Sequence, residues 1–156
     1  MKHFSLKTKC LLIGALVAAI VLLCISVFAQ VNRPYRNGSV WNISFIRVKP
    51  GMDQAYMNYL ASQWKTNQEA SKKDGLILSY KVIATEAHGT GDWNILLMTE
   101  YKDLATREAN EPKEDALLQR VVGDDQKQMQ GYKDRSEIRE VMGTRLAREV
   151  VLEPRR

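Results

Sequence analysis

Polar residues recur inside segments that are otherwise apolar, and these are the first candidates for chemistry. If the strand faces that carry them turn inward, a lysine and a carboxylate would meet in a small polar cavity, where burial shifts the pKa values of both groups. Such a pair could donate and accept protons in catalysis. The alternative is structural, with the charges at sheet edges or paired across a subunit interface. The cavity set comprises Asn42, Ser79, Lys81, Asn94, Glu100 and Glu149, of which Asn42, Lys81, Glu100 and Glu149 are the catalytic candidates.

Aromatic side chains and one arginine form a second set, of types that could hold an apolar ligand. Their large apolar surfaces commonly line binding pockets. At strand or helix spacing, however, aromatic residues more often fill the core, and Trp64 and Tyr80 would then pack against each other between a helix and the sheet. The ligand-binding candidates are Trp41, Arg47, Trp64, Tyr80, Trp93 and Tyr101.

Thiol and metal chemistry lack the residues they need beyond the first 29 positions. Both cysteines, Cys10 and Cys24, lie within that segment, and His88 is the one histidine that follows it. A metal site needs several convergent ligands. We therefore expect no bound metal and no cofactor.

The first 29 residues have the pattern of an export signal. The first nine contain three lysines and no acid, residues 10–29 carry no charge, and the stretch ends in Val-Phe-Ala. A basic region, an apolar region and small residues before the cleavage point are the signature of a signal peptide. We expect cleavage after Ala29 and a periplasmic or secreted domain. Twenty uncharged residues could also cross a bilayer core of ~30 Å, so an uncleaved inner-membrane anchor is the alternative.

The formal net charge of +5 depends largely on that signal. Without its three lysines, the chain carries 20 basic against 18 acidic residues. Nucleic-acid-binding surfaces usually show a basic stripe interleaved with aromatic residues, and the sequence contains no such stripe. We therefore expect no nucleic-acid partner.

After the signal, a polar stretch at residues 30–39 predicts a linker, and residues 40–153 predict one domain. Runs of β-branched and aromatic residues predict strands, and longer segments with helical spacing predict two helical regions, the second interrupted near Pro112 and Gly123. The order β-α-β-β-α-β predicts an α+β, ferredoxin-like fold, an antiparallel sheet with its helices on one face. The strands are expected at residues 40–49, 76–85, 93–101 and 146–152, and the helical regions at 52–74 and 102–143.

Apolar residues at three- and four-residue spacing indicate which helix faces should be buried. The stripe of the first helical region consists of Met52, Tyr56, Tyr59, Leu60 and Trp64. The stripe of the second consists of Met129, Tyr132, Ile138, Val141 and Met142, with Gly143 as the cap.

The strand at residues 40–49 is apolar on both faces. Trp41, Ile43 and Phe45 occupy one face, and the other carries Val40, Ile46 and Val48. Strands of this kind are covered on both sides. Because the helices can cover only one side, we expect a second copy of the chain to cover the other in a symmetric dimer.

The segments VWNISFIRVKPGM, LILSYKV, DWNILLMTEY and MGTRLAREVVL resemble the dimeric α/β-barrel superfamily, which includes antibiotic-biosynthesis monooxygenase-like and NIPSNAP-like domains. The resemblance covers residues 38–153 and is greatest to small exported bacterial proteins of this type. It implies an exported homodimer of unassigned activity, which binds either a small apolar ligand or no ligand between its two sheets. Some haem-degrading members use a histidine on the second helix. Residues 102–143 contain none, so haem is not expected.

The resemblance leaves two other functions open. Cofactor-independent monooxygenases of the superfamily use a pocket of asparagine, tryptophan, tyrosine and arginine. All four types occur here in the corresponding elements, as Asn42, Trp41, Trp64, Tyr80, Tyr101 and Arg47. The other alternative is an envelope interaction module that stays anchored in the membrane through the uncleaved N-terminal segment.

Overall fold

The computed structural model describes residues 34–89 and 91–153, and the expected signal peptide at residues 1–29 lies outside them. Residues Arg36–Leu152 form one compact unit, and of the described residues Pro34, Tyr35 and Glu153 lie outside it. Within the described residues, no helix has both the length and the apolar character that a membrane span requires.

Four strands form one antiparallel sheet in the order β2-β3-β1-β4. The strands are β1 (Tyr35–Val48), β2 (Ser79–Ala84), β3 (Ile95–Tyr101) and β4 (Arg139–Leu152). At opposite ends of β4, Lys49 N–H donates to Ile138 O at 3.0 Å and Glu153 N–H to Pro34 O at 2.8 Å, so β4 runs antiparallel to β1. The predicted α+β class is confirmed, and the arrangement is consistent with a ferredoxin-like fold.

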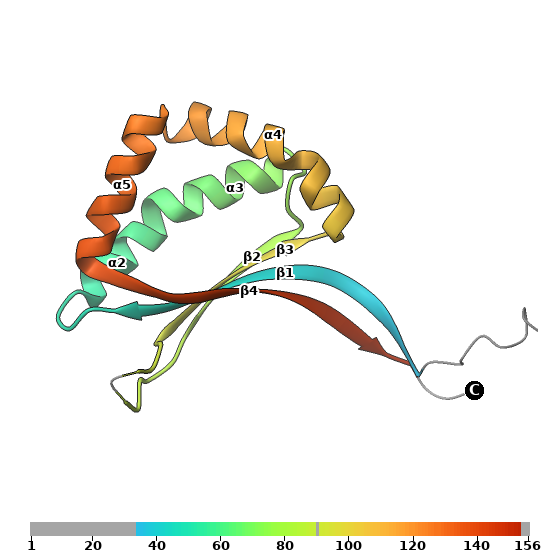
Figure 1. Cartoon of the computed structure of the whole chain (residues 1–156), viewed down its shortest axis with the longest axis horizontal. Helices are drawn as coiled ribbons and strands as arrows, with labels where there is room; N and C mark the ends of the chain where they lie inside the picture. The colour runs from blue at the N-terminus through green and yellow to red at the C-terminus, as the bar shows by residue number, and fades with distance from the viewer. Residues whose placement is uncertain (1–33, 90, 154–156) are drawn as a thin grey trace, which may run out of the picture. The chain divides into compact units, whose positions relative to one another are not determined.

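The helices lie on one side of this sheet (Figure 1). The first is a continuous run of α2 (Asp53–Tyr59), the π-helical segment η1 (Leu60–Trp64) and α3 (Lys65–Lys73). The others are α4 (Leu104–Val121) and α5 (Asp125–Ile138). A π-helical turn inside an α-helix is uncommon, and this one places Leu60 and Trp64 against the sheet side of the molecule.

The register of β1 on β3 decides which side chains meet the helices. Val40 lies opposite Tyr101 and Ile46 opposite Ile95, and all four side chains are buried. Because strand side chains alternate between faces, Trp41, Ile43 and Phe45 lie on the face without helices, together as the sequence predicts. The two-sided character of β1 is therefore confirmed.

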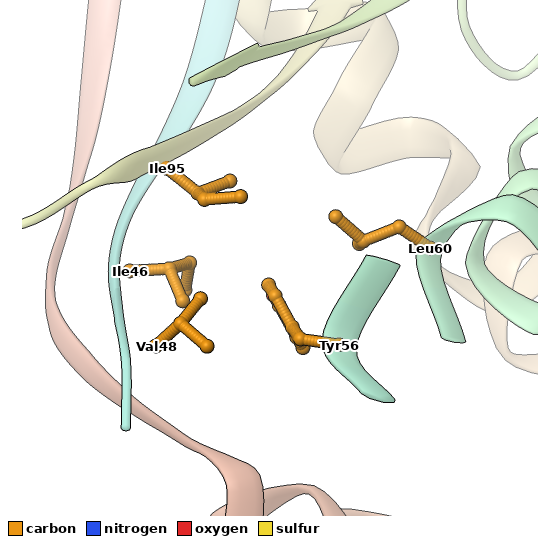
Figure 2. Close-up of a cluster of buried hydrophobic side chains, with 5 residues drawn as sticks. All are labelled: Ile46, Val48, Tyr56, Leu60 and Ile95. Atoms are coloured by element: carbon orange, nitrogen blue, oxygen red, sulfur yellow. The ribbon is translucent and has the colours of Figure 1, made fainter. Parts of the chain in front are cut away.

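One apolar cluster joins the sheet to the first helix (Figure 2). Ile46, Val48 and Ile95 extend from the strands toward Tyr56 and Leu60 on the helix. Tyr56 is fully buried and Leu60 is 4% exposed. The predicted stripe at residues 52–64 thus contains two core residues, because positions four apart lie on one helix face.

A second cluster lies where β3 runs into α4. It contains Leu76, Ile77, Tyr101 and Leu117. Leu76 and Ile77 follow Gly75, whose φ of 71° needs the freedom of glycine and ends the first helix. The residues expected to begin the second strand therefore enter the core just before β2.

The first strand is longer than the sequence indicates. β1 begins at Tyr35, inside the stretch expected to be a linker. Its polar beginning is stabilised by pairing with β4, where Ser39 Oγ donates to Glu149 Oε2 at 3.3 Å. Gly38 permits this close approach, because a Cβ there would lie 2.9 Å from the Cβ of Glu149.

The boundary between the last helix and the last strand differs most from expectation. β4 begins at Arg139 rather than at residue 146, so Val141, Met142 and Gly143 belong to a strand and the expected cap at Gly143 is wrong. Of the predicted buried helix face, Ile138 does pack against the core, but Met129 and Tyr132 are 59% and 56% exposed, so their predicted burial is wrong. Long-range pairing with β1 outweighs the local helical spacing here.

The expected breaks in the second helical region have different outcomes. The break near Gly123 is confirmed. The φ of Gly123 is 120°, and the Asp124 side chain then caps α5 by accepting from Lys127 N–H at 2.9 Å. The break near Pro112 is wrong, because Pro112 lies inside α4.

Candidate functional site

The face of the sheet without helices is largely apolar. Its register follows from the pairing of β1, β3 and β2, in which Ile43 is opposite Met98 and Met98 opposite Lys81. The apolar residues of this face are Trp41, Ile43, Phe45, Ile83, Leu96 and Met98. Ile83 is 45% exposed. We call this set, with the polar residues between them, the open face.

Polar groups gather at one corner of the open face. Trp41 lies opposite Glu100, and Glu100 lies opposite Ser79. Ser79 Oγ donates to Glu100 Oε2 at 2.5 Å. The ammonium of Lys81 lies 5.1 Å from the centre of the Trp41 ring, a cation–π distance. Lys81 and Glu100 each have a partner of their own, so the corner can present one cation and one anion to a ligand.

Asn42 does not join this corner. It lies opposite Thr99, which in turn lies opposite Tyr80, and this row faces the helices. Trp64 packs edge to face on Tyr80 with ring centres 5.3 Å apart, as expected for a packing role between helix and sheet. The Tyr80 hydroxyl donates to Glu69. The hydrogen bond to this carboxylate raises the pKa of Tyr80.

The structure places three further candidates in separate contacts. Arg47 Nη2 donates to Glu140 Oε2 at 2.6 Å. Trp93 packs on Phe45 at the edge of the open face, with ring centres 5.5 Å apart. Asn94 Oδ1 accepts from Val48 N–H at 2.9 Å and so serves the backbone of β1.

Tyr101 and Glu149 lie at other points of the sheet. Tyr101 is buried on the helix side, where the Arg107 guanidinium lies 5.5 Å from its ring centre. Burial raises the pKa of Tyr101, and the nearby carboxylate of Glu114 adds to the rise. Glu149 pairs with Ser39 near the far ends of β1 and β4. The six polar residues considered together from the sequence therefore do not line one cavity within a single chain.

A stack of tyrosines and arginines joins the first helix to α5, and no sequence argument identified it. Tyr56 and Tyr59 are stacked with ring centres 5.8 Å apart. Arg135 lies 5.2 Å from the Tyr59 ring centre and Arg139 lies 5.9 Å from that of Tyr56. Arg135 lies in α5 and Arg139 begins β4, so helical spacing in the sequence could not show that both arginines would contact the tyrosines.

Burial dominates the electrostatics of this stack. Desolvation raises the pKa of Tyr56 to about 12, although the nearby guanidinium of Arg139 opposes the rise. The Tyr56 hydroxyl is buried without a hydrogen-bond partner, and so are the Nε atoms of Arg135 and Arg139. Burial raises the pKa of Tyr59 as well. The contacts that the described residues make with these two guanidiniums include cation–π contacts to the tyrosine rings.

Two surface grooves include residues of the stack in their lining. One, of about 450 Å³, is lined by Lys49, Tyr132, Ser136, Arg139, Glu140 and Val141. The other, of about 420 Å³, includes Tyr59, Lys127 and Arg135 in its lining. Across residues 34–89 and 91–153, no three side chains of the metal-ligating types come together.

The sequence matches no protein-family model, and a search of curated proteins found no significant match. The class of the protein is therefore defined by its fold alone, an α+β domain whose sheet is covered by helices on one side.

Proposed function

We propose that this chain is an exported homodimer of the dimeric α/β-barrel type, in which the open faces of two sheets pack together around a small, mostly apolar molecule. The observation that carries the proposal is the open face itself. Six apolar side chains make up most of it, and none of the helices in residues 34–89 and 91–153 covers it.

An apolar face of this kind is costly in water. Monomeric proteins rarely expose large contiguous apolar patches, and those that occur usually mark an interface. Each additional Å² of apolar surface removed from water contributes about 25 cal/mol. Trp41, Phe45 and Leu96 are half-buried in the single chain, and packing against a second sheet would remove their remaining apolar surface from water.

The size of the sheet suits a dimer interface. β1 and β4 each contain 14 residues, and β2 and β3 contain 6 and 7. With a rise of ~3.4 Å per residue and strands ~4.8 Å apart, the sheet covers roughly 650 Å² in projection. Stable interfaces bury ~800 Å² of accessible surface per partner, and protruding side chains raise the accessible area above the projected area.

The polar corner also fits two-fold symmetry. A buried cation or carboxylate is costly unless it is paired. Since a two-fold axis presents the same surface twice, the Lys81 ammonium of one copy can compensate the Glu100 carboxylate of the other. Trp41 and Ser79, which hold these two groups, would then form the polar end of the space between the sheets.

The proposal of export rests on the N-terminal segment. The basic start, the uncharged residues 10–29 and the Val-Phe-Ala end would direct the domain across the membrane. N-terminal sequencing of the exported protein distinguishes the two fates of this segment. A chain that begins at Gln30 is released as a soluble dimer, and a chain that retains the segment is anchored.

Native mass spectrometry of the full chain, purified from its own compartment in a non-ionic detergent, tests both the dimer and the ligand. We expect a mass of two chains, together with a retained small molecule. A monomer at micromolar concentration would contradict the dimer. A dimer that never retains a molecule would contradict the ligand.

Two lysine substitutions provide a matched comparison. Ile83 on the open face and Met57 on α2 are both 45% exposed. Ile83→Lys should convert the dimer to monomer, because it places a charge between two apolar sheets. Met57→Lys should leave the dimer intact. Equal effects of the two substitutions would show that the open face is not the interface, and circular dichroism checks that both variants are folded.

A further inference from the structure

The groove beside the tyrosine–arginine stack carries unbalanced positive charge. Lys49 and Arg139 both line it. The Lys49 N–H donates to Ile138 O at 3.0 Å, so the two cations occupy adjoining positions where β1 ends and β4 begins. Like charges that converge on one groove repel each other, and a bound anion would relieve this repulsion.

The acidic residue in the groove is already neutralised. Glu140 Oε2 accepts from Arg47 Nη2 at 2.6 Å, and Arg47 does not line the groove. The carboxylate of Glu140 is therefore compensated by a cation outside the groove. The positive charges of Lys49 and Arg139, which line the same groove, are therefore not offset by Glu140.

The Arg139 head group is held in place by packing. Its guanidinium lies 5.9 Å from the centre of the buried Tyr56 ring, and its Nε atom is buried. A guanidinium fixed in this way is preorganised, so less rotamer entropy is lost when it binds an oxyanion. Guanidiniums bind carboxylates and phosphates particularly well.

The rest of the groove is suited to an apolar substituent. Tyr132 and Val141 line it beside the cations. Their side chains are 56% and 40% exposed, so each offers apolar surface that a ligand could cover. Binding pockets typically combine such walls with a few placed polar groups.

We propose that this groove binds a small organic oxyanion, with its carboxylate or phosphate on Lys49 and Arg139 and its apolar part against Tyr132 and Val141. The site is separate from the open face. None of its lining residues belongs to the set that defines the open face.

Amide NMR titrations of the ¹⁵N-labelled full chain in a non-ionic detergent test this site with benzoate, phenyl phosphate and uncharged benzamide. Benzoate or phenyl phosphate should shift the amide signals of Lys49 and Val141, and benzamide should not. Stronger binding of benzoate would identify a carboxylate ligand, and stronger binding of phenyl phosphate a phosphate ester. Benzamide binding as tightly as both anions would overturn the proposal.

Charge-removing variants locate the binding. Arg139→Gln should weaken binding of the tighter anion roughly tenfold, because charge-assisted hydrogen bonds to the guanidinium are lost. Lys127→Gln is the control, since Lys127 is also a cation but lines the other groove. If Arg139→Gln does not fold, the exposed Lys49→Gln decides the question. Unchanged affinity in the folded variants would exclude this groove as the site.

Discussion

Replacing Tyr56 with phenylalanine should stabilise the protein, although it removes a polar group from the core. The Tyr56 hydroxyl is buried without a hydrogen-bond partner, and an unsatisfied buried donor costs about 1–3 kcal/mol. Phenylalanine keeps the ring that stacks on Tyr59 and lies beneath Arg139. At neutral pH we therefore expect the free energy of unfolding to rise by about 1 kcal/mol.

The same substitution should change the alkaline stability. Burial raises the pKa of Tyr56 from 10.0 to about 12, so the folded state holds this proton more tightly than the unfolded state. The corresponding stability is fully present below pH 10 and is lost as the pH rises toward 12. A difference of two pKa units corresponds to roughly 3 kcal/mol in the free energy of unfolding. Because Tyr56→Phe has no hydroxyl at this position, its stability should not fall by this amount between pH 10 and pH 12.

Urea unfolding followed by circular dichroism, at one protein concentration and at several pH values, measures both effects. Tyr132→Phe, at a tyrosine that is 56% exposed, is the control and should leave the stability at neutral pH unchanged. Destabilisation of Tyr56→Phe by more than 1 kcal/mol at neutral pH would refute the reasoning, since it would reveal a partner for the hydroxyl.

Two further substitutions test the core and the break between the last helices. Leu60→Ala should lower the free energy of unfolding by about 2–5 kcal/mol, because Leu60 is 4% exposed in the cluster of Figure 2. The control Leu152→Ala, at an 80% exposed position, should lower it little. Thermal or urea unfolding measures both variants. Asp124→Ala should cost about 1 kcal/mol because the carboxylate caps α5; an equal loss in Asp125→Ala, just inside the helix, would show that the cap is not the cause.

The sequence predicts those parts of the fold where local pattern and long-range contact agree. In β1 the alternation of Trp41, Ile43 and Phe45 with the buried positions matches the two faces of the sheet. In the first helix, Tyr56 and Leu60 share a face because they are four residues apart. At the end of α5 the local pattern and the long-range contacts disagree. Met129 and Val141 share one helical spacing in the sequence, but α5 ends at Ile138 and Val141 lies in β4.

The candidate site was harder to predict because it depends on register. Asn42 and Lys81 fall on opposite faces through the pairing of β1, β3 and β2, and a shift of one residue in either strand would reverse this. The tyrosine–arginine stack brings together α2 and the end of α5, more than 70 residues apart in the chain. Helical spacing within either segment carries no information about such a contact.

The hydrogen bond from Glu153 N–H to Pro34 O brings the two ends of the described chain to one point. In a variant that consists of residues 34–153 alone, a short peptide could therefore join Glu153 to Pro34, and new ends could be opened in the exposed turn around Gly89, where an added Cβ would meet nothing within 4 Å. Circular permutation of this kind is commonly tolerated when the termini are adjacent and the new opening lies in a surface loop. A reporter domain attached after Glu153 would emerge beside Pro34, at the point where the chain enters the sheet.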